Sequence, residues 1–307
     1  MKKTIGIPRA FLYYRYKILW KTFFRNLGFK LIISDQTTKQ TIDIGKKYSI
    51  DESCLASKIY IGHVYNLLNK CDYILIPRVC NYGKEENVCV KFNANYDIIK
   101  NTFPNIKIID YNIEKTKKSP ESIALIKLGI KLTKRPIKVL ISYFKAITTA
   151  KKIEHKKIIN QQKKLTTSNL KVLVVSHPYN IYDNYIGKPI IKKLEKEKIE
   201  VIYSDLTNKL LAKKYAKKLS PTLYWTYSKE LIGSIEYYKE YINGIIFLTT
   251  FPCGPDSLVN ELMIRKITNI PTLNIIIDDM YSETGIDTRI ESFVDILKER
   301  SDKYWIT

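Results

Sequence analysis

Residues 244–257 read Gly-Ile-Ile-Phe-Leu-Thr-Thr-Phe-Pro-Cys-Gly-Pro-Asp-Ser, an apolar run followed by a stretch of turn-forming residues. The run 244–249 predicts a buried strand because it is short, apolar and bounded by turn residues. Asp256 and Ser257 are residue types that favour the start of a helix, so we expect the next helix to begin there. A buried strand that leads into a helix through a short loop is typical of α/β folds.

Cys253 lies in the loop between this strand and this helix, next to Pro252 and Gly254. The proline fixes φ, the glycine allows close approach, and the dipole of a helix N-terminus favours a thiolate. These features make Cys253 a candidate ligand or nucleophile. The alternative is a small buried apolar cysteine, which is the commoner fate of a lone cysteine.

The same alternation of strand and helix patterns extends to both ends of the chain. Near the N-terminus, apolar residues recur at helical spacing from Leu12 to Leu27, and Gly28 is placed to end that helix. Strand patterns on both sides of this helix complete a β-α-β unit, which favours a parallel sheet. The remaining expected strands lie near residues 71–78, 106–109, 171–176, 200–203 and 271–277. We therefore predict an α/β protein with two flavodoxin-like parallel-sheet domains, 1–112 and 169–307, joined by a basic helical connecting segment, 113–168.

The connecting segment carries much of the charge of the chain. Residues 111–170 hold 15 Lys/Arg and 3 Asp/Glu, a net charge of +12 out of the total of +22. Pro136 interrupts or restarts a helix, and the lysine-rich pattern from 137 to 164 predicts a long exposed helix. A solvated face is the favoured interpretation, and a surface that binds an acidic partner is the alternative. Because the excess charge is concentrated here, we do not expect nucleic acid as a partner.

The composition also limits where the protein works. A chain of 307 residues with 45% hydrophobic residues can form two cores. No apolar run approaches the roughly 20 residues that span a bilayer, so we expect no membrane insertion. The first strand pattern is too short for the core of a signal peptide. Five cysteines at irregular spacing do not form a disulfide framework, which predicts a reducing, cytoplasmic location.

Several polar residues are expected where parallel sheets bind ligands, beyond the carboxyl ends of the strands. Cys253 and the pair Asp278 and Asp279 follow expected strands, and Cys54 and Cys89 lie in loops or helix starts next to them. The sequence has no Cys-x-x-Cys pair, three histidines, no phosphate-binding loop and no dinucleotide fingerprint, which argues against structural zinc and against nucleotide binding. Spacing alone leaves open a metal–sulfur cluster and a cysteine–histidine nucleophile.

Characteristic stretches occur in one order over nearly the whole chain: Ile5-Gly-Ile-Pro-Arg-Ala10, Glu52-Ser-Cys54, Gly62-His-Val64, Asp72-Tyr-Ile-Leu-Ile-Pro-Arg78, Cys89, His177-Pro-Tyr-Asn-Ile-Tyr-Asp183, Phe251-Pro-Cys-Gly-Pro-Asp256, Glu283-Thr-Gly-Ile-Asp-Thr-Arg289 and Glu291-Ser-Phe293. With these stretches the chain resembles the acyl-CoA dehydratase activase-related family, akin to the iron–sulfur subunits of 2-hydroxyacyl-CoA dehydratases. The order of so many stretches is far more specific than any one of them.

The resemblance implies a 4Fe-4S cluster held by Cys54, Cys89 and Cys253, with one iron open to water, sulfide or substrate. It also implies an ATP-dependent iron–sulfur activase as the donor of low-potential electrons. The chemistry would be reductive or radical, related to 2-hydroxyacyl-CoA dehydration, on an acyl-CoA or a small molecule. Leu55 and Val90 stand where the family pattern has prolines after the ligands.

Other interpretations stay open. The chain could be an electron carrier or maturation partner without a substrate of its own, or a cluster-free ligand-binding scaffold. Cys80 is either a fourth ligand or a loop thiol, and His63 is either a packed residue or a proton donor. Arg9 and Arg78 could offset the charge of a cluster or form ion pairs. Whether the chain forms a dimer is left open.

Overall fold

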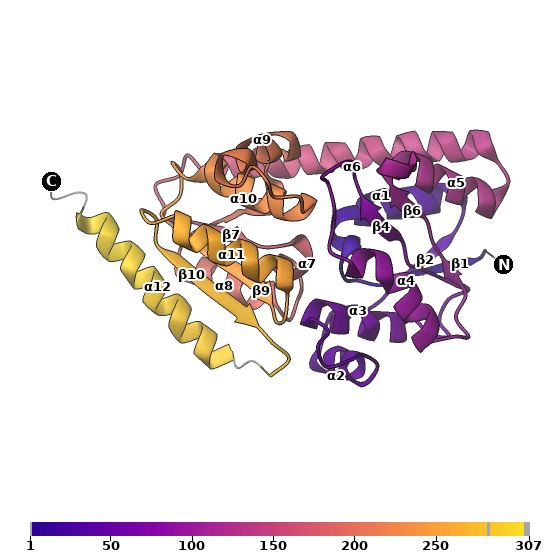
Figure 1. Cartoon of the computed structure of the whole chain (residues 1–307), viewed down its shortest axis with the longest axis horizontal. Coiled ribbons are helices and arrows are strands. Elements are labelled where there is room, and N and C mark those ends of the chain that lie inside the picture. Colours follow the sequence, from indigo (N-terminus) through magenta and orange to yellow (C-terminus); the bar gives the residue numbers. More distant parts are fainter. Residues whose placement is uncertain (1, 281–282, 304–307) are drawn as a thin grey trace. The chain divides into compact units, whose positions relative to one another are not determined.

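The computed structural model describes residues 2–280 and 283–303 of the chain (Figure 1). The chain folds into two compact units: Met1–His155 with Tyr224–Thr226, and Lys156–Leu223 with Tyr227–Thr307. Each unit contains a four-stranded parallel sheet flanked by helices. This confirms the predicted α/β class with two flavodoxin-like parallel-sheet domains. The division into three segments at residues 112 and 168 stays a prediction.

The sheet of the N-terminal unit has the strand order β2-β1-β3-β5. Its strands are short: β1 (Thr4–Ile7), β2 (Lys30–Ile33), β3 (Tyr73–Leu75) and β5 (Ile108–Ile109). Helix α1 (Leu12–Leu27) connects β1 to β2 and buries Trp20, Phe23 and Phe24 in the core. As predicted, the helix ends at Gly28, which has a left-handed φ of 102° that favours glycine.

The other helices that belong wholly to this unit are α2 (Lys39–Lys47), α3 (Leu55–Tyr65), α4 (Lys91–Thr102) and α5 (Glu121–Thr133). Helices α2 and α3 approach until their backbones touch. A Cβ atom at Gly62 would lie 2.0 Å from the carbonyl oxygen of Thr41, and one at Gly45 would lie 1.9 Å from that of Lys58. Glycine is therefore required at both crossing points, and α3 is buried along almost its whole length.

A second, two-stranded parallel sheet in this unit was not predicted. It pairs β4 (Arg78–Asn81) with β6 (Asn112–Glu114), and a short 3₁₀ helix, Lys115–Lys117, follows. The expectation of a loop around Cys80 is wrong, because Cys80 lies on β4. The strands are short and partly polar, so they lack the apolar run on which a strand prediction depends.

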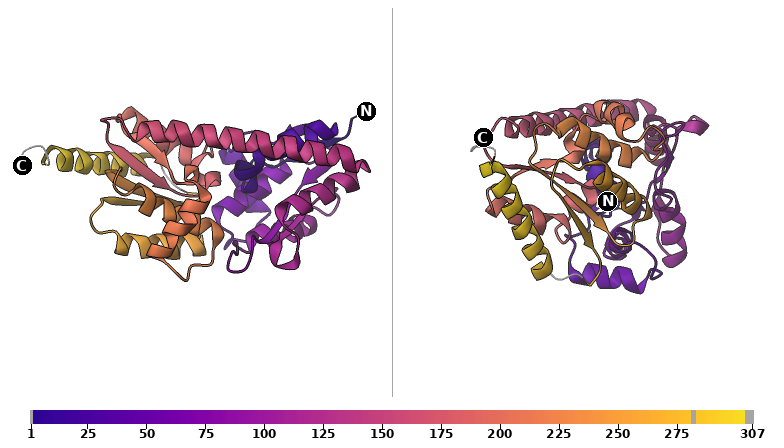
Figure 2. Two further views of the ribbon diagram at one scale, coloured as in Figure 1. Left: turned by 90° about the horizontal axis from the view of Figure 1, so that it is seen from above. Right: turned by 60° about the vertical axis from the view of Figure 1, so that its left-hand side comes forward.

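Helix α6 (Pro136–Lys164) begins at Pro136, which confirms that this proline restarts the helical pattern. Figure 2 shows α6 as one long, continuous helix. Its residues up to His155 belong to the N-terminal unit, and the rest belong to the C-terminal unit. Neither α6 nor any other helix within residues 2–280 and 283–303 is long and apolar enough to cross a membrane.

The sheet of the C-terminal unit has the order β10-β9-β7-β8. Its strands are β7 (Lys171–Val175), β8 (Glu200–Tyr203), β9 (Gly244–Thr250) and β10 (Thr272–Ile277). All seven residues of β9 and all five of β7 are buried, as expected for central strands covered on both faces. The surrounding helices are α7 (Pro178–Ile181), α8 (Gly187–Lys196), the 3₁₀ helix Ser204–Leu206, α9 (Lys209–Leu219), α10 (Thr226–Tyr238), α11 (Gly254–Lys266) and α12 (Glu283–Lys303).

Thr288 and Glu291 have the spacing of a capping box, but the last helix does not start there. Helix α12 begins at Glu283, so both residues lie inside the helix, and Glu291 pairs with Lys193 of α8 at 2.5 Å. The helix packs against β9, since a Cβ atom at Gly244 would lie 2.7 Å from the ring of Phe293.

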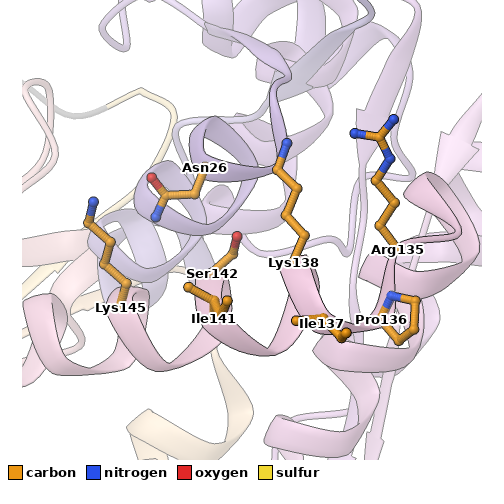
Figure 3. Close-up of a pocket in the computed structure, with 8 residues that line it drawn as sticks. All are labelled: Asn26, Arg135, Pro136, Ile137, Lys138, Ile141, Ser142 and Lys145. Carbon is orange, nitrogen blue, oxygen red and sulfur yellow. The ribbon is translucent and has the colours of Figure 1, made fainter.

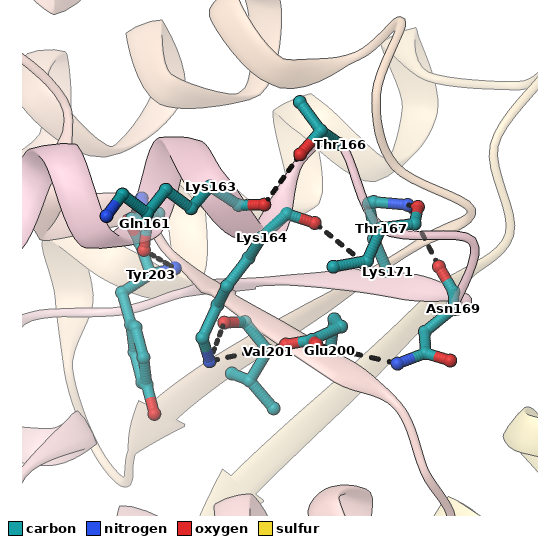
Figure 4. A network of polar contacts seen from close by, with 10 residues as sticks. All are labelled: Gln161, Lys163, Lys164, Thr166, Thr167, Asn169, Lys171, Glu200, Val201 and Tyr203. Carbon is teal, nitrogen blue, oxygen red and sulfur yellow. Dashed lines mark hydrogen bonds and ion pairs between the residues drawn. The ribbon is translucent and has the colours of Figure 1, made fainter.

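The last turns of α6 bind to β8, which is an edge strand of this sheet. The side-chain amide of Gln161 accepts a hydrogen bond from the backbone N–H of Tyr203 (2.8 Å) and donates one to its carbonyl oxygen (3.0 Å). Lys164 forms an ion pair with Glu200 at 3.5 Å on the same strand (Figure 4). A glutamine thus takes the place of a neighbouring strand along β8, which protects an edge that could pair with another chain.

Candidate functional site

Cys253 is the N-cap residue of α11 and follows the central strand β9 by three residues. Helix α11 begins at Gly254, earlier than the start predicted from Asp256 and Ser257, which is therefore wrong. Asp256 does not cap the helix because its carboxylate is held by other side chains. The helix start therefore lies next to the cysteine itself.

A buried polar cluster surrounds the side chain of Asp256. His177 Nε2 lies 2.9 Å from Asp256 Oδ1, and the hydroxyl of Thr249 donates to Oδ2 at 3.3 Å. The thiol of Cys253 also hydrogen-bonds to this carboxylate. His177 is 6% exposed and Asp256 is 5% exposed, so both are shielded from water. We call Thr249, Cys253, Asp256 and His177 the β7–β9 cluster.

The electrostatics of this cluster favour an ionised carboxylate. Burial alone raises the pKa of Asp256, but attraction to His177 and hydrogen bonds from His177, Cys253 and Thr249 outweigh it, and the pKa lies below its ordinary value. The imidazole of His177 stacks on Tyr179, with centroids 4.9 Å apart, and meets the ring of Tyr227 edge-on at 6.1 Å. The histidine and the carboxylate therefore hold each other in one orientation beside the thiol.

The sheet topology explains why these residues meet. His177 follows β7 and Asp256 follows β9, and these two strands pair in parallel with Val175 opposite Phe247. In the order β10-β9-β7-β8 the chain reverses direction between β7 and β9, which is the position where open α/β sheets bind ligands. The sequence left His63 and His177 as equal candidates to lie beside a thiolate and indicated Asp256 only as a helix cap. The signal available was that both residues follow strands expected in the same sheet.

Asp278 and Asp279 were predicted at the same edge of this sheet. Asp278 Oδ1 accepts a hydrogen bond from the backbone N–H of Met280 at 2.9 Å, so its side chain closes the turn after β10. Within the described residues, the polar groups that hold Asp256 come from β9, α11 and the segment after β7, and the aspartate pair is not among them.

Cys54 and Cys89 lie in the N-terminal unit. Cys54 is the N-cap residue of α3, and the carbonyl of Cys89 accepts a hydrogen bond from the N–H of Phe92 (3.0 Å) in the first turn of α4. The ammonium of Lys91 donates to the hydroxyl of Ser53 at 3.4 Å. This contact joins the chain next to Cys54 to the chain next to Cys89, so the starts of α3 and α4 are neighbours.

The other two cysteines are of a different kind. The thiol of Cys71 donates to the carbonyl of Leu67 (3.5 Å), and that of Cys80 donates to Asn112 Oδ1 (3.6 Å). Burial raises the pKa of both thiols. All five cysteines are half-buried, and none of them forms a disulfide. Only the three predicted ligands among the five stand at the start of a helix.

The remaining candidate residues of the N-terminal unit have structural roles. His63 is fully buried, its Nε2 lies 3.0 Å from the hydroxyl of Thr37, and burial together with the nearby Arg9 lowers its pKa to about 3. It is therefore a packed, neutral residue. Arg78 forms a forked ion pair with Asp97 (2.7 and 2.9 Å) and lies over the ring of Tyr96. The ion-pair interpretation of Arg78 is thus confirmed.

Within the described residues, no group of three or more His, Cys, Asp or Glu side chains is arranged to hold a single metal ion. A metal–sulfur cluster makes a different demand, because each thiolate binds a separate iron and the ligands come from separate loops. Positions at helix N-termini suit such a group, since the N–H dipoles offset the negative charge of thiolates.

Solved structures align with the whole chain at low similarity. They include the substrate-binding protein FpvC from Pseudomonas aeruginosa with Mn²⁺ (10% identity, TM-score 0.28, covering 99% of this chain and 100% of that chain). They also include ZnuA (8% identity, TM-score 0.29, covering 97% of this chain and 99% of that chain). Zinc-bound AdcA from Streptococcus pneumoniae aligns with 12% identity and a TM-score of 0.28, covering 97% of this chain and 57% of that chain. TM-scores this low do not establish a shared fold or function.

No curated protein matches the chain. A family profile does match, over residues 4–207, which is about two thirds of the sequence. That profile is described as the CoA enzyme activase uncharacterised domain. Over this span lie Cys54, Cys89 and His177. The chain therefore belongs to the CoA enzyme activase uncharacterised domain family.

Proposed function

We propose that this protein binds a 4Fe-4S cluster through Cys54, Cys89 and Cys253 and accepts low-potential electrons from an ATP-dependent activase. The observation that carries the proposal is the division of the five cysteines into two kinds. Three stand at helix starts, as cluster ligands do when the helix dipole offsets thiolate charge. The other two do not stand at helix starts, and burial raises the pKa of both of their thiols.

When bound, a cluster of this kind supplies one-electron transfer at low potential. The chain itself would orient the ligands. The hydrogen bond between His177 and Asp256 holds the carboxylate that hydrogen-bonds to Cys253, and the contact of Lys91 with Ser53 joins the two helix starts of the N-terminal unit. Residues next to ligating groups commonly fix their orientation in this way.

Two further points support the partner and the reaction class. The family description names a CoA enzyme activase, which fits an activase as the source of electrons. The resemblance of the ordered motifs to iron–sulfur subunits of 2-hydroxyacyl-CoA dehydratases favours reductive or radical chemistry on an acyl-CoA or a small molecule. The reaction itself is proposed at this level of class only.

Anaerobic purification tests the cluster directly. We expect a brown protein with broad absorption near about 400 nm and about four irons per chain. Cys54→Ala, Cys89→Ala and Cys253→Ala should each lose iron and colour, while Cys71→Ala should keep both. Cys80→Ala decides whether Cys80 is a fourth ligand. A colourless, iron-free wild-type protein would favour the scaffold interpretation, and full iron in any of the three variants would show that its cysteine is misassigned.

Turnover separates an enzyme from an electron carrier. The reduced protein is mixed with candidate acyl-CoA thioesters or small-molecule acceptors, and product formation is followed with and without the activase and ATP. Product that depends on this protein supports an enzyme. Reoxidation without product, in the presence of a downstream acceptor protein, supports the carrier.

A further inference from the structure

The first half of α6 is apolar on two opposite faces. Val139, Ser142 and Ala146 are buried against the N-terminal unit, as expected for a helix that packs on a core. The opposite face also carries apolar side chains, at positions i, i+3, i+4 and i+7, and these are exposed: Ile137 (74%), Leu140 (42%), Ile141 (64%) and Phe144 (63%). A solvated, lysine-rich face would present charges at these positions, so this face is unlike the one expected from composition.

Part of this outer face lines a groove of about 650 Å³ against the C-terminal end of α1. Asn26 of α1 forms one side, and Ile137 and Ile141 of α6 contribute its apolar part. The ammonium of Lys138 donates to the carbonyl of Leu27 at 3.3 Å and thereby joins the two helices. The groove lies entirely within the N-terminal unit and is built on two regular helices.

The polar lining of the groove is cationic and offers hydrogen-bond donors. Figure 3 shows Arg135, Lys138 and Lys145 extending to the same side of α6, with Asn26 facing them from α1. Within the described residues none of these three cations pairs with a carboxylate. The side-chain nitrogen of Asn26 is buried and has no hydrogen-bond partner within the described residues. An occupant that brings carboxylate oxygens to the groove would pair with these cations.

We propose that this groove binds an acidic amphipathic helix of a protein partner. Ile137 and Ile141 offer an apolar strip on which the apolar face of a helix can pack, and the cations beside the strip select acidic residues next to that face. A bilayer surface is flat and does not fill a groove between two helices. A second copy of this chain is disfavoured because each copy carries a formal charge of +22. The inference does not depend on the proposed iron–sulfur chemistry.

Binding is tested with the full-length protein and a fluorescent helical peptide of about four turns, with leucines on one face and glutamates beside them. Fluorescence anisotropy should show saturable binding that weakens as salt is added. A peptide with lysines in place of the glutamates, and one with serines in place of the leucines, should not bind. Equal binding of all three peptides would overturn the proposal.

Paired variants test whether the groove is the binding site. Arg135→Glu with Lys145→Glu should weaken binding by about tenfold or more, whereas Lys70→Glu with Lys100→Glu, which changes net charge equally, should change it less than about twofold. Ile137→Ser with Ile141→Ser should weaken binding similarly, whereas Ile50→Ser with Leu210→Ser, equally exposed apolar positions elsewhere, should not. Circular dichroism confirms that each variant is folded. Equal effects of the groove and control pairs would contradict the proposal.

Two measurements exclude the other occupants. Vesicles with and without phosphatidylglycerol test a lipid surface, and sedimentation velocity over a range of concentrations tests self-association. We expect neither to respond to the groove variants. Vesicle binding or dimer formation that the groove variants abolish, with no binding of the acidic peptide, would replace the proposed helix by a membrane or by a second copy.

Discussion

The two units share one strand order but hold their predicted ligands differently. In the C-terminal unit, Cys253 belongs to the β7–β9 cluster, where a buried histidine and a buried carboxylate fix the segment that carries the thiol. In the N-terminal unit, a hydrogen bond of 3.4 Å from Lys91 to Ser53 connects the chain next to Cys54 with the chain next to Cys89. The same topology thus places a buried histidine–carboxylate pair beside the cysteine in one unit and a lysine–serine hydrogen bond beside the cysteines in the other.

The corresponding position in the N-terminal sheet has a different content. There the chain reverses between β1 and β3; Arg9 lies in the loop after β1, and Arg78 begins β4, three residues after the end of β3. Arg9 donates from Nε to the carbonyl of Ser34 at 3.0 Å, and Arg78 pairs with Asp97. A shared fold therefore does not imply a shared site, since the side chains beyond the strand ends decide what each unit can hold.

The largest expected effect is that of Asp256→Ala. It leaves the buried His177 without its partner, so the free energy of unfolding should fall by about 4 kcal/mol. Urea unfolding, followed by tyrosine and tryptophan fluorescence, measures the loss. Asp256→Asn, which keeps a hydrogen-bond acceptor, should recover a substantial part of it. A loss below about 1 kcal/mol for the alanine variant would end the contrast between the units.

A second test uses Asp205 of the C-terminal unit, which makes the free energy of unfolding depend on pH. Burial raises the pKa of Asp205 to about 6, although Tyr182 donates to it at 3.0 Å and Lys157 and Lys209 lie nearby. The stability that the protonated carboxyl contributes is complete below about pH 4 and is lost as the pH rises through about 6. Asp205→Asn should therefore gain about 3 kcal/mol relative to the wild type between about pH 4 and pH 7. Parallel pH profiles of the two proteins would show that Asp205 is not responsible.

His63 has the opposite dependence in the N-terminal unit. The pKa of His63 in the folded protein, about 3, lies below the ordinary value of 6.5. The stability that the neutral imidazole contributes is therefore complete above about pH 6.5 and is lost as the pH falls towards about 3. At about pH 5 the wild-type protein should have lost about 2 kcal/mol that His63→Gln does not lose. Urea unfolding of both proteins at about pH 7 and pH 5 measures the difference. An equal loss in the variant would assign the acid sensitivity to other groups.

The smallest expected effect is that of Ser53→Ala. It removes the acceptor of a long hydrogen bond (3.4 Å) from Lys91, whose side chain is half-buried and can turn to water, so the free energy of unfolding should fall by less than about 1 kcal/mol. Chemical denaturation beside the Asp256→Ala variant gives the ratio of the two effects. A cost close to that of Asp256→Ala would mean that the N-terminal cysteines are held as firmly as Cys253.

The sequence was sufficient for the fold because strands such as 244–249 and helices such as Leu12–Leu27 carry their own periodicity. It was insufficient where a contact with a residue far along the chain outweighs the local preference of a residue. Asp256 is a typical capping residue, but His177 holds its carboxylate, and α11 starts at Gly254 instead. The pairing of β4 with β6 was missed since neither strand is apolar enough to be recognised alone.

For the candidate site, the sequence and the family resemblance gave the three cysteines but no contacts between them and their surroundings. The pairing of His177 with Asp256 spans 79 positions along the chain. No local sequence pattern predicts such a contact, because the contact depends on the parallel pairing of β7 with β9.

That long separation has a consequence for synthesis. His177 is translated early, yet its partner carboxylate and Cys253 emerge only after β9, and β9 gains its second neighbour when β10, residues Thr272–Ile277, has left the ribosome. Long-range parallel pairing of this kind forms late. The environment of the Cys253 thiol is therefore complete only after the chain has been synthesised through Ile277, so loading of any cofactor at this residue follows the synthesis of that segment.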